Sequence, residues 1–456
     1  MVALVRKLLL DQGLAARAMR SSAWTVMGYG GGQAIRLISN LILTRILFPE
    51  AFGLMALVTV FIMGLVMFSD VGIGPSILQN KRGDEPDFLN TAWTIQVVRG
   101  VILWLGTCAI AIPAATFYNE PMLAQLLPVA GVSLLVAGFN PTRIETAARH
   151  LLIGRLTLID LSAQTIGIIA MGILAWIFES IWALVAGTVI TAFAKLVLSL
   201  IFLPGERNRF RWEPTAAHEL IHFGKWIFLS TICGFLIGQG DRAILGKYLS
   251  MYLLGIYNIG YFLASFPLLL GSAVMGRLMI PLYRERPPSA SAENFQRLRK
   301  MRFAMSGGLL SLVLTMAFFG PFLIGVMYDD RYIAAGGIVV LIACVQITTV
   351  IGLTYDQSAL AAGDSRNFFF FTALRASVQT AFFLVGAEIG GMTGALVGQG
   401  IAGITVYPFL IRLARRHGAW DPLHDGIFFS VGYLLGAVAL WLHHDKIALL
   451  AQLVAP

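Results

Sequence analysis

Long apolar runs recur from residue 22 to the carboxyl end of the chain. Each is close to the ~20 residues that a membrane-spanning helix needs. Lipid offers no hydrogen-bond partners, so a backbone that crosses it must form helices or a closed barrel. Barrel strands would alternate apolar and polar residues over about ten positions, whereas these runs are longer and apolar on all sides. The sequence therefore predicts an all-α, polytopic membrane protein.

The composition excludes a soluble body of this size. Of the 456 residues, 57% are hydrophobic and only 12% are charged, against about 25% charged in soluble domains. The net charge of +9 would suggest nucleic-acid binding in a soluble protein, but the basic residues fall in short loops between apolar runs. That distribution follows the positive-inside rule, so we expect no nucleic-acid partner.

The apolar runs predict twelve core helices and one extra helix. The basic loops alternate with loops of few charges, which places the N-terminus in the cytoplasm. The expected helices lie near residues 22–46, 52–74, 92–116, 121–141, 156–178, 181–203, 221–246, 252–277, 303–327, 332–360, 367–388, 391–413 and 426–442. The longest loop is expected at about 278–300, and it is basic.

These helices group into two lobes of six. We expect an amphipathic cytoplasmic segment at 1–21, an N-lobe at 22–203 and a cytoplasmic linker at 204–220. A C-lobe at 221–413 and an extra C-terminal helix with a tail at 414–456 complete the chain.

Matching segments in the two halves indicate an internal repeat. Residues 44–55 align without a gap with residues 246–257, and Gly53 falls on Gly255. Later, "SAQTIG" from residue 162 matches "SVQTAF" from residue 377, and "WALVAG" from residue 182 matches "GALVGQ" from residue 394. Repeats of this kind are typical of transporters, whose substrate sites lie between the repeats.

Several segments resemble a known family. They are "LILTRILFPEAFGLMALVTVF" (41–61), "ARHLLIGRLTLIDLSAQTIG" (148–167), "GQGDRAILGKYLSMYLLGIYNIGYFLA" (238–264) and "SALAAGDSRNFFFFTALRASVQTAFFLVG" (358–386). Together they are similar to the Wzx-like polysaccharide transporter branch of the multidrug/oligosaccharidyl-lipid/polysaccharide exporter superfamily, over about residues 20–415. Many relatives carry two further helices after the twelve, whereas this chain has one and a stub.

The resemblance implies a flippase with a central cavity that opens to each side of the membrane in turn. Its cargo would be an undecaprenyl-diphosphate-linked oligosaccharide, moved across the bacterial inner membrane for exopolysaccharide, O-antigen or capsule synthesis. The implied partners are membrane lipids, a polysaccharide polymerase and other assembly proteins. We expect no catalytic residue, no resident metal and no cofactor.

Cations within spanning helices are the candidate substrate-binding residues, because charge in lipid is costly and is usually kept for function. Arg36 is the first candidate, followed by Arg99, Lys225 and Arg242. The planar guanidinium can donate to two phosphate oxygens at once, which suits a diphosphate. The structural alternative is that Arg99 and Lys225 extend to the membrane surface.

Four acids within or near the helices are candidates for coupling transport to protons or sodium ions: Asp70, Asp160, Asp241 and Asp356. Such acids often line ion pathways in transporters. The alternative is that they form structural ion pairs with Arg36, Arg99 or Arg375.

Two other functions are compatible with parts of the sequence. A multidrug exporter of the same superfamily would share the fold, but it would favour an acidic, aromatic pocket for cations. A zinc metalloprotease is suggested by "HELIH", in which His218 and His222 would bind zinc, Glu219 would act as base and Asp425 could be a third ligand.

Overall fold

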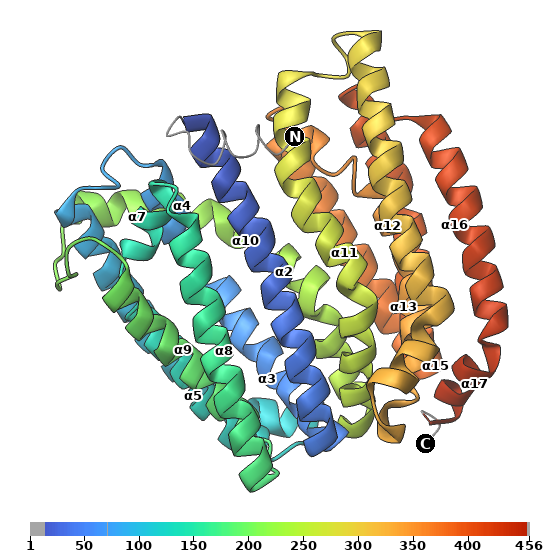
Figure 1. Ribbon diagram of the computed structural model, residues 1–456, viewed down its shortest axis with the longest axis horizontal. Coiled ribbons are helices and arrows are strands. Elements are labelled where there is room, and N and C mark those ends of the chain that lie inside the picture. The colour runs from blue at the N-terminus through green and yellow to red at the C-terminus, as the bar shows by residue number, and fades with distance from the viewer. Residues whose placement is uncertain (1–13, 71, 454–456) are drawn as a thin grey trace, which may run out of the picture. The chain divides into compact units, whose positions relative to one another are not determined.

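The computed structural model describes residues 14–70 and 72–453, without the side chains of 14–23, 221–229, 277, 278 and 451–453. All regular elements within these residues are helical (Figure 1). The main helices are α2 (Leu14–Ile46), α3 (Pro49–Phe68), α5 (Pro86–Tyr118), α6 (Leu123–Gly138), α8 (Ile153–Phe178), α9 (Trp182–Phe202), α10 (Pro214–Tyr248), α11 (Met251–Glu285), α12 (Ala292–Met327), α13 (Ala335–Gly352), α15 (Ser365–Arg416) and α16 (Pro422–Leu442). Shorter helices are α4 (Ile73–Gln79), α7 (Arg143–Arg149), η1 (Asp330–Tyr332), α14 (Ser358–Ala361) and α17 (His444–Leu453).

Nine helices of the described residues are long and apolar enough to cross a membrane, or ten if the bent pair α6–α7 forms one span. The predicted all-α, multi-pass membrane protein is therefore confirmed. The finer arrangement, twelve core spans plus one, stays a prediction.

Several predicted helix ends are wrong. The N-terminal segment expected at 1–21 lies largely outside the described residues, but its last part belongs to α2, which begins at Leu14. The expected helix 52–74 ends at Phe68. The long loop expected at 278–300 is short, because α11 continues to Glu285 and α12 begins at Ala292. Polar residues such as those of 292–300 have good helix propensity, so a helix can extend beyond the apolar run.

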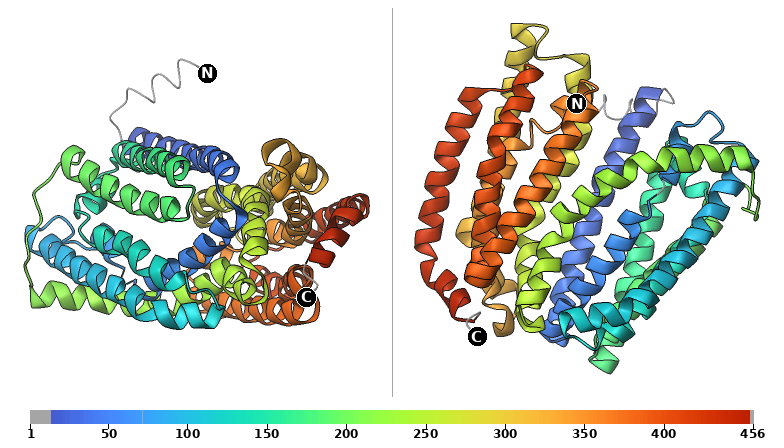
Figure 2. Two further views of the ribbon diagram at one scale, coloured as in Figure 1. Left: turned by 90° about the horizontal axis from the view of Figure 1, so that it is seen from below. Right: turned by 180° about the vertical axis from the view of Figure 1, so that it is seen from behind.

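The chain forms two compact units. The first comprises residues 1–48 and 58–232, and the second comprises residues 49–57 and 233–456. In the first unit α5 packs on α6, and α8 packs on both α2 and α9. Within the second unit α13 contacts α11, α12, α15 and α16 (Figures 1 and 2). Because 83% of the residues of α13 are buried, this helix is the centre of that unit.

The helix α15 is a hairpin of two antiparallel halves, 365–389 and 392–416. Its run of helical residues is interrupted at Gly390 and at Gly391, which has φ 57° and ψ −139°. The halves touch through glycines: a β-carbon on Gly394 would overlap the backbone of Gly386, and one on Gly398 would overlap that of Phe382. Small residues allow this close approach.

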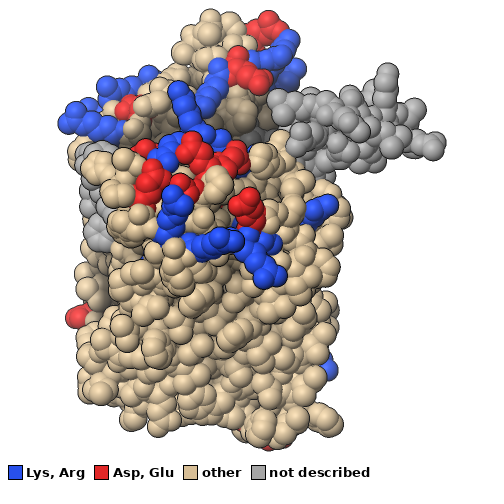
Figure 3. All heavy atoms as spheres, turned by 90° about the vertical axis from the view of Figure 1, so that its left-hand side faces the viewer, with Lys and Arg blue, Asp and Glu red and all other residues tan. Residues whose placement is uncertain are grey.

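Loops at one end of the first unit carry most of its charges, above an extensive apolar surface (Figure 3). There Arg82 pairs with Glu213 at 2.8 Å, and Arg149 pairs with Asp84 at 3.0 Å. The helices α4 and α7 contact each other in the same region. A charged end above an apolar wall is the expected surface of a protein embedded in lipid.

Candidate functional site

Arg36 lies on α2 and has an exposed side chain. The neighbouring glycines bring α2 close to α8: Gly32 accepts a hydrogen bond from the Gln164 amide at 3.4 Å, and Gly31 faces Leu161. Among the described residues, no carboxylate or hydrogen-bond acceptor is paired with the Arg36 guanidinium. Its donors are therefore available to an anion.

The side chain of Arg99 is hydrogen-bonded to residues at the end of α3. Its guanidinium donates to the carbonyl oxygen of Val66 at 2.8 Å and to the hydroxyl of Ser69 at 3.0 Å. Just beyond, Asp70 accepts a hydrogen bond from the backbone N–H of Gly72 at 2.9 Å. These contacts satisfy polar groups where α3 ends, a structural role that differs from the membrane-surface position considered for Arg99 and from the ion pair considered for Asp70.

Asp160 of α8 pairs with Lys195 of α9 at 2.8 Å. This partner is not among the three arginines considered from the sequence. Both side chains are substantially exposed, at 56% for Asp160 and 38% for Lys195. The pair neutralises two charges on neighbouring helices of the first unit.

In the second unit, Arg242 of α10 is surrounded by partners. It donates to the amide oxygen of Asn258 at 3.1 Å, pairs with Asp241 at 3.4 Å and lies over the ring of Tyr261 at 4.1 Å. Asp241 also accepts a hydrogen bond from Tyr257 at 2.7 Å. Arg242 thus differs from Arg36, whose guanidinium has no such partners within the described residues. The side chain of Lys225 lies outside the described residues.

A cavity of about 120 Å³, mainly apolar but with several polar side chains in its wall, lies within the second unit between α10, α11, α13 and α15. Its charged members are Asp356, just after α13, and Arg375 of α15, which pair at 3.6 Å. The amide of Gln346 also faces the cavity, and its buried oxygen has no hydrogen-bond partner among the described residues. The remaining polar lining is Tyr261, Thr348, Thr349, Gln379, Gln399 and Tyr407. A space of this size and polarity can hold water or a small cation.

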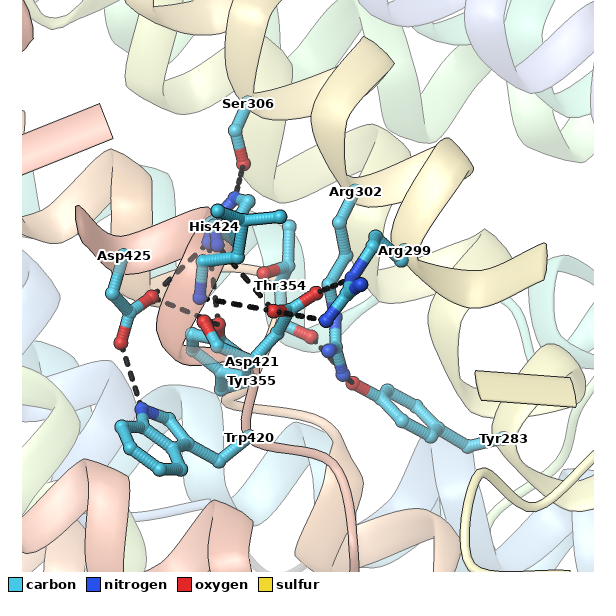
Figure 4. A network of polar contacts seen from close by, with 11 residues as sticks. Tyr283, Arg299, Arg302, Ser306, Thr354, Tyr355, Trp420, Asp421, His424 and Asp425 are labelled. Carbon is cyan, nitrogen blue, oxygen red and sulfur yellow. Dashed lines mark hydrogen bonds and ion pairs between the residues drawn. The ribbon is translucent and has the colours of Figure 1, made fainter. Parts of the chain in front are cut away.

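The sequence did not predict a second polar cluster in this unit (Figure 4). Arg302 of α12 is fully buried and donates to the hydroxyl of Tyr283 at 2.6 Å. Its guanidinium also lies 4.6 Å from the ring centroid of Tyr355. Because α12 begins at Ala292, eleven residues before the helix expected at 303–327, Arg302 lies just outside the predicted apolar run.

The same cluster holds the start of α16. Arg299 makes two hydrogen bonds to Asp421, at 2.5 and 2.8 Å, and Tyr355 donates to Asp425 at 2.8 Å. Trp420 also donates to Asp425, at 2.9 Å. These hydrogen bonds attach the start of α16 to α12 and to the turn after α13.

Two arrangements in the chain are reminiscent of hydrolytic enzymes. His424 lies 2.9 Å from the hydroxyl of Ser306 and 3.1 Å from Asp425, but both Ser306 and His424 are 0% exposed, so no substrate reaches them. In the metalloprotease motif, Glu219 accepts a hydrogen bond from Asn80 at 2.7 Å. The side chain of His222 lies outside the described residues.

Comparison with known proteins identifies the family. The chain matches the polysaccharide biosynthesis protein family over residues 42–335. It is 21% identical to the succinoglycan biosynthesis transport protein ExoT of Rhizobium meliloti, covering 92% of this chain and 84% of that protein. It is 20% identical to the lipopolysaccharide biosynthesis protein WzxC of Escherichia coli, covering 79% and 73%.

Solved structures share the fold. An inward-facing multidrug resistance MATE family transporter of the MOP superfamily matches with a TM-score of 0.60, at 13% identity, over 84% of this chain and 95% of that chain. The lipid II flippase MurJ matches with a TM-score of 0.59, at 11% identity, over 92% and 99%. The family match covers well over half of the sequence and agrees with the segments that resemble Wzx-like transporters, so this multi-pass membrane protein belongs to the polysaccharide biosynthesis protein family.

Proposed function

We propose that the chain is a flippase for lipid-linked oligosaccharides. Its cargo would be an undecaprenyl-diphosphate-linked unit, moved from the cytoplasmic to the periplasmic leaflet of the bacterial inner membrane. The names of the relatives place them in succinoglycan transport and in lipopolysaccharide biosynthesis. The product would be an exopolysaccharide, an O-antigen or a capsule, and a polymerase would take the cargo afterwards.

The unpaired guanidinium of Arg36 carries this proposal. A charged side chain in a spanning helix costs several kcal/mol unless it is paired or hydrated. Among the four candidate cations, Arg99 and Arg242 already have acceptors, whereas Arg36 has none in the described part of the chain. A diphosphate that passes α2 would supply the missing acceptor, because guanidinium donates well to phosphate oxygens.

The proposed topology has thirteen spans and a cytoplasmic N-terminus. It adds α2, α10 and the second half of α15 to the ten apolar spans. Transport would proceed by alternating access, without any change in covalent bonds. The basic loops then face the cytoplasm, as the positive-inside rule requires.

The cavity around Asp356 is the proposed site for a coupling ion. A proton or a sodium ion bound to the Asp356 carboxylate would compete with Arg375, which lies 3.6 Å away. Gln346 would offer a further oxygen, since its buried amide oxygen lacks a partner among the described residues. An ion gradient could thereby change the packing of α13 against α15.

A multidrug exporter is the second candidate, favoured by the likeness to MATE family structures. That likeness concerns the fold only. An exporter of organic cations would be opposed by an uncompensated arginine such as Arg36, because like charges repel. Drug-resistance profiling of a deletion strain separates the two functions: unchanged resistance with loss of polysaccharide supports the flippase.

The direct test is transport in liposomes. Purified protein should move a fluorescent undecaprenyl-diphosphate-linked sugar between leaflets, and Arg36→Ala should slow this at least tenfold while Arg36→Lys retains part of it. Arg286→Ala, in the loop between α11 and α12, is the matched control and should transport normally. Absence of transport by the wild type, or equal transport by wild type and Arg36→Ala, would refute the proposal.

A further inference from the structure

The α15 hairpin carries a groove with two arginines at its edge. The groove measures about 200 Å³ and runs between the two halves of the hairpin. Its floor includes Phe371 and Leu413, both buried, and its walls include Phe370 and Phe409, which are 57% and 50% exposed. Half-exposed aromatic rings beside a buried apolar floor can hold a hydrocarbon chain.

The arginines of this groove are Arg412 and Arg416, which lie four positions apart and therefore on one face of the helix. Both are exposed, and no carboxylate lies within ion-pair distance of either among the described residues. The nearest acid, Asp364, instead pairs with His417 at 3.2 Å and accepts hydrogen bonds from Asn367 at 2.8 Å. Asp364 also feels the charge of Arg416, but neither arginine makes an ion pair within the described residues. The groove thus joins an apolar channel to two cations that can still accept an anionic partner.

A second groove of the same kind lies in the first unit, between α8 and α9. It measures about 610 Å³ and is lined by the apolar side chains of Leu158, Ile159, Ile201 and Phe202. Arg155 is its cation, and its side chain is exposed and has no carboxylate partner within the described residues. The acid on the same helix, Asp160, is already neutralised by Lys195.

The internal repeat places the two grooves at equivalent positions. Extending the ungapped match of residues 162–167 with 377–382 aligns Ile159 with Leu374. Extending the match of 182–187 with 394–399 aligns Ile201 with Leu413. All four residues line the grooves. The arginines of the two grooves do not align with each other. Arg155 lies on α8, the first helix of its matched pair, whereas Arg412 and Arg416 lie on the second half of α15. Both matched pairs thus form a groove with a cation, but from different positions.

We propose that each groove binds one anionic phospholipid of the surrounding bilayer, such as phosphatidylglycerol. Its phosphate would accept hydrogen bonds from Arg155 in the first unit and from Arg412 and Arg416 in the second, while an acyl chain lies along the apolar floor. Arginines at helix ends lie where the positive-inside rule places phosphate headgroups. The proposal concerns bilayer lipid and does not depend on the identity of the cargo.

Native mass spectrometry of the full chain in nanodiscs tests this. With mixed phosphatidylglycerol and phosphatidylethanolamine, the wild type should retain two phosphatidylglycerol molecules. Arg155→Gln should lose one, and Arg412→Gln/Arg416→Gln should lose the other. Each arginine removed should weaken the apparent affinity about fivefold, since a basic residue near an anionic headgroup contributes a similar factor.

Arg415→Gln is the matched control, because Arg415 lies over the ring of Trp420 at 3.8 Å instead of lining the groove. It should retain both lipids. Undiminished retention in the two groove variants, or equal loss in Arg415→Gln, would overturn the proposal. Arg155→Lys should restore retention if Arg155→Gln proves too unstable to measure.

Discussion

Gly53 of α3 and Gly255 of α11 pack backbone against backbone, and neither position has room for a side chain. A β-carbon on Gly53 would overlap the carbonyl of Met251, and one on Gly255 would overlap the carbonyl of Pro49. The two glycines are also aligned by the sequence match of residues 44–55 with residues 246–257. The contact is reciprocal, because each glycine lies against the first residue of the other glycine's helix.

Gly53→Leu should destabilise the protein by about 3 kcal/mol, because overpacking a close contact forces the backbone apart. Gly255→Leu should have a similar effect. Gly325→Ala is the control, since a β-carbon there meets no atom within 4 Å, and it should unfold at or above the wild-type temperature. Thermal unfolding in detergent measures all three. Equal unfolding temperatures for Gly53→Leu and wild type would contradict the close contact.

Gly391→Ala should destabilise the α15 hairpin by about 2 kcal/mol. Its backbone, at φ 57° and ψ −139°, lies in a region that essentially only glycine adopts. Gly390→Ala is a control one residue away, because that residue has φ −140° and open space around its α-carbon. Thermal unfolding should separate the two variants. Equal effects would mean that the turn tolerates a side chain at both positions.

The pair of Arg299 and Asp421 should make stability depend on pH. Burial is the largest influence on Asp421 and raises its pKa, but the hydrogen bonds from Arg299, the backbone N–H of His424 and the charges of Arg299 and Arg302 together leave the pKa below its ordinary value. The pair therefore stabilises the folded state above the ordinary pKa of an aspartate, and this contribution is lost as the pH falls through the lowered pKa. Arg299→Gln should cost about 3 kcal/mol at neutral pH and shift acid unfolding to higher pH.

The matched variant for this pair is Arg297→Gln, because the ion pair that Arg297 makes within the described part of the chain is with Glu293, on the exposed side of the same helix. Its acid-unfolding midpoint should stay at the wild-type value. Unfolding followed by tryptophan fluorescence between pH 3 and pH 7 compares the variants. The same midpoint in Arg299→Gln and wild type would contradict the prediction.

Tyr283→Phe should destabilise the protein more than Arg302→Met. The tyrosine hydroxyl is the hydrogen-bond acceptor of the buried Arg302, whose Nε and Nη1 have no partner among the described residues. Removing the hydroxyl leaves a buried charge without that acceptor, at a cost of about 2 kcal/mol. Methionine in place of Arg302 removes the charge itself, which is often nearly neutral. Chemical unfolding of the purified variants measures the order, and the reverse order would refute this account.

The helices could be predicted from the sequence because a spanning run of about 20 apolar residues leaves few alternatives. Their ends could not, as α12 shows. It begins at Ala292, where Ser291 accepts a hydrogen bond from the backbone of Asn294, within a charged stretch that no membrane argument covers. Hydropathy locates the part of a helix that lies in lipid, but it does not predict how many helical residues continue beyond the membrane.

The candidate charges were found because they interrupt apolar runs. Their partners were harder to predict. Asp356 pairs with one of the arginines considered from the sequence, Arg375, whereas Asp160 pairs with Lys195. Arg299 and Asp421 lie 122 positions apart, and only the folded packing of α12 beside α16 brings them together. Pairings over such separations depend on tertiary structure, and local patterns in one sequence do not reveal which distant residues meet.

The chain passes between its two compact units at three places, of which one lies between α2 and α3 and two lie inside helices. Helix α3 changes unit between Leu57 and Val58, and helix α10 changes unit between Ile232 and Cys233. A loop could swivel at almost no cost, but an unbroken helix resists bending through its ladder of hydrogen bonds. The helices α3 and α10 therefore resist bending at these two places. A movement of one compact unit that bends either helix costs elastic energy, and this energy favours the return of the unit.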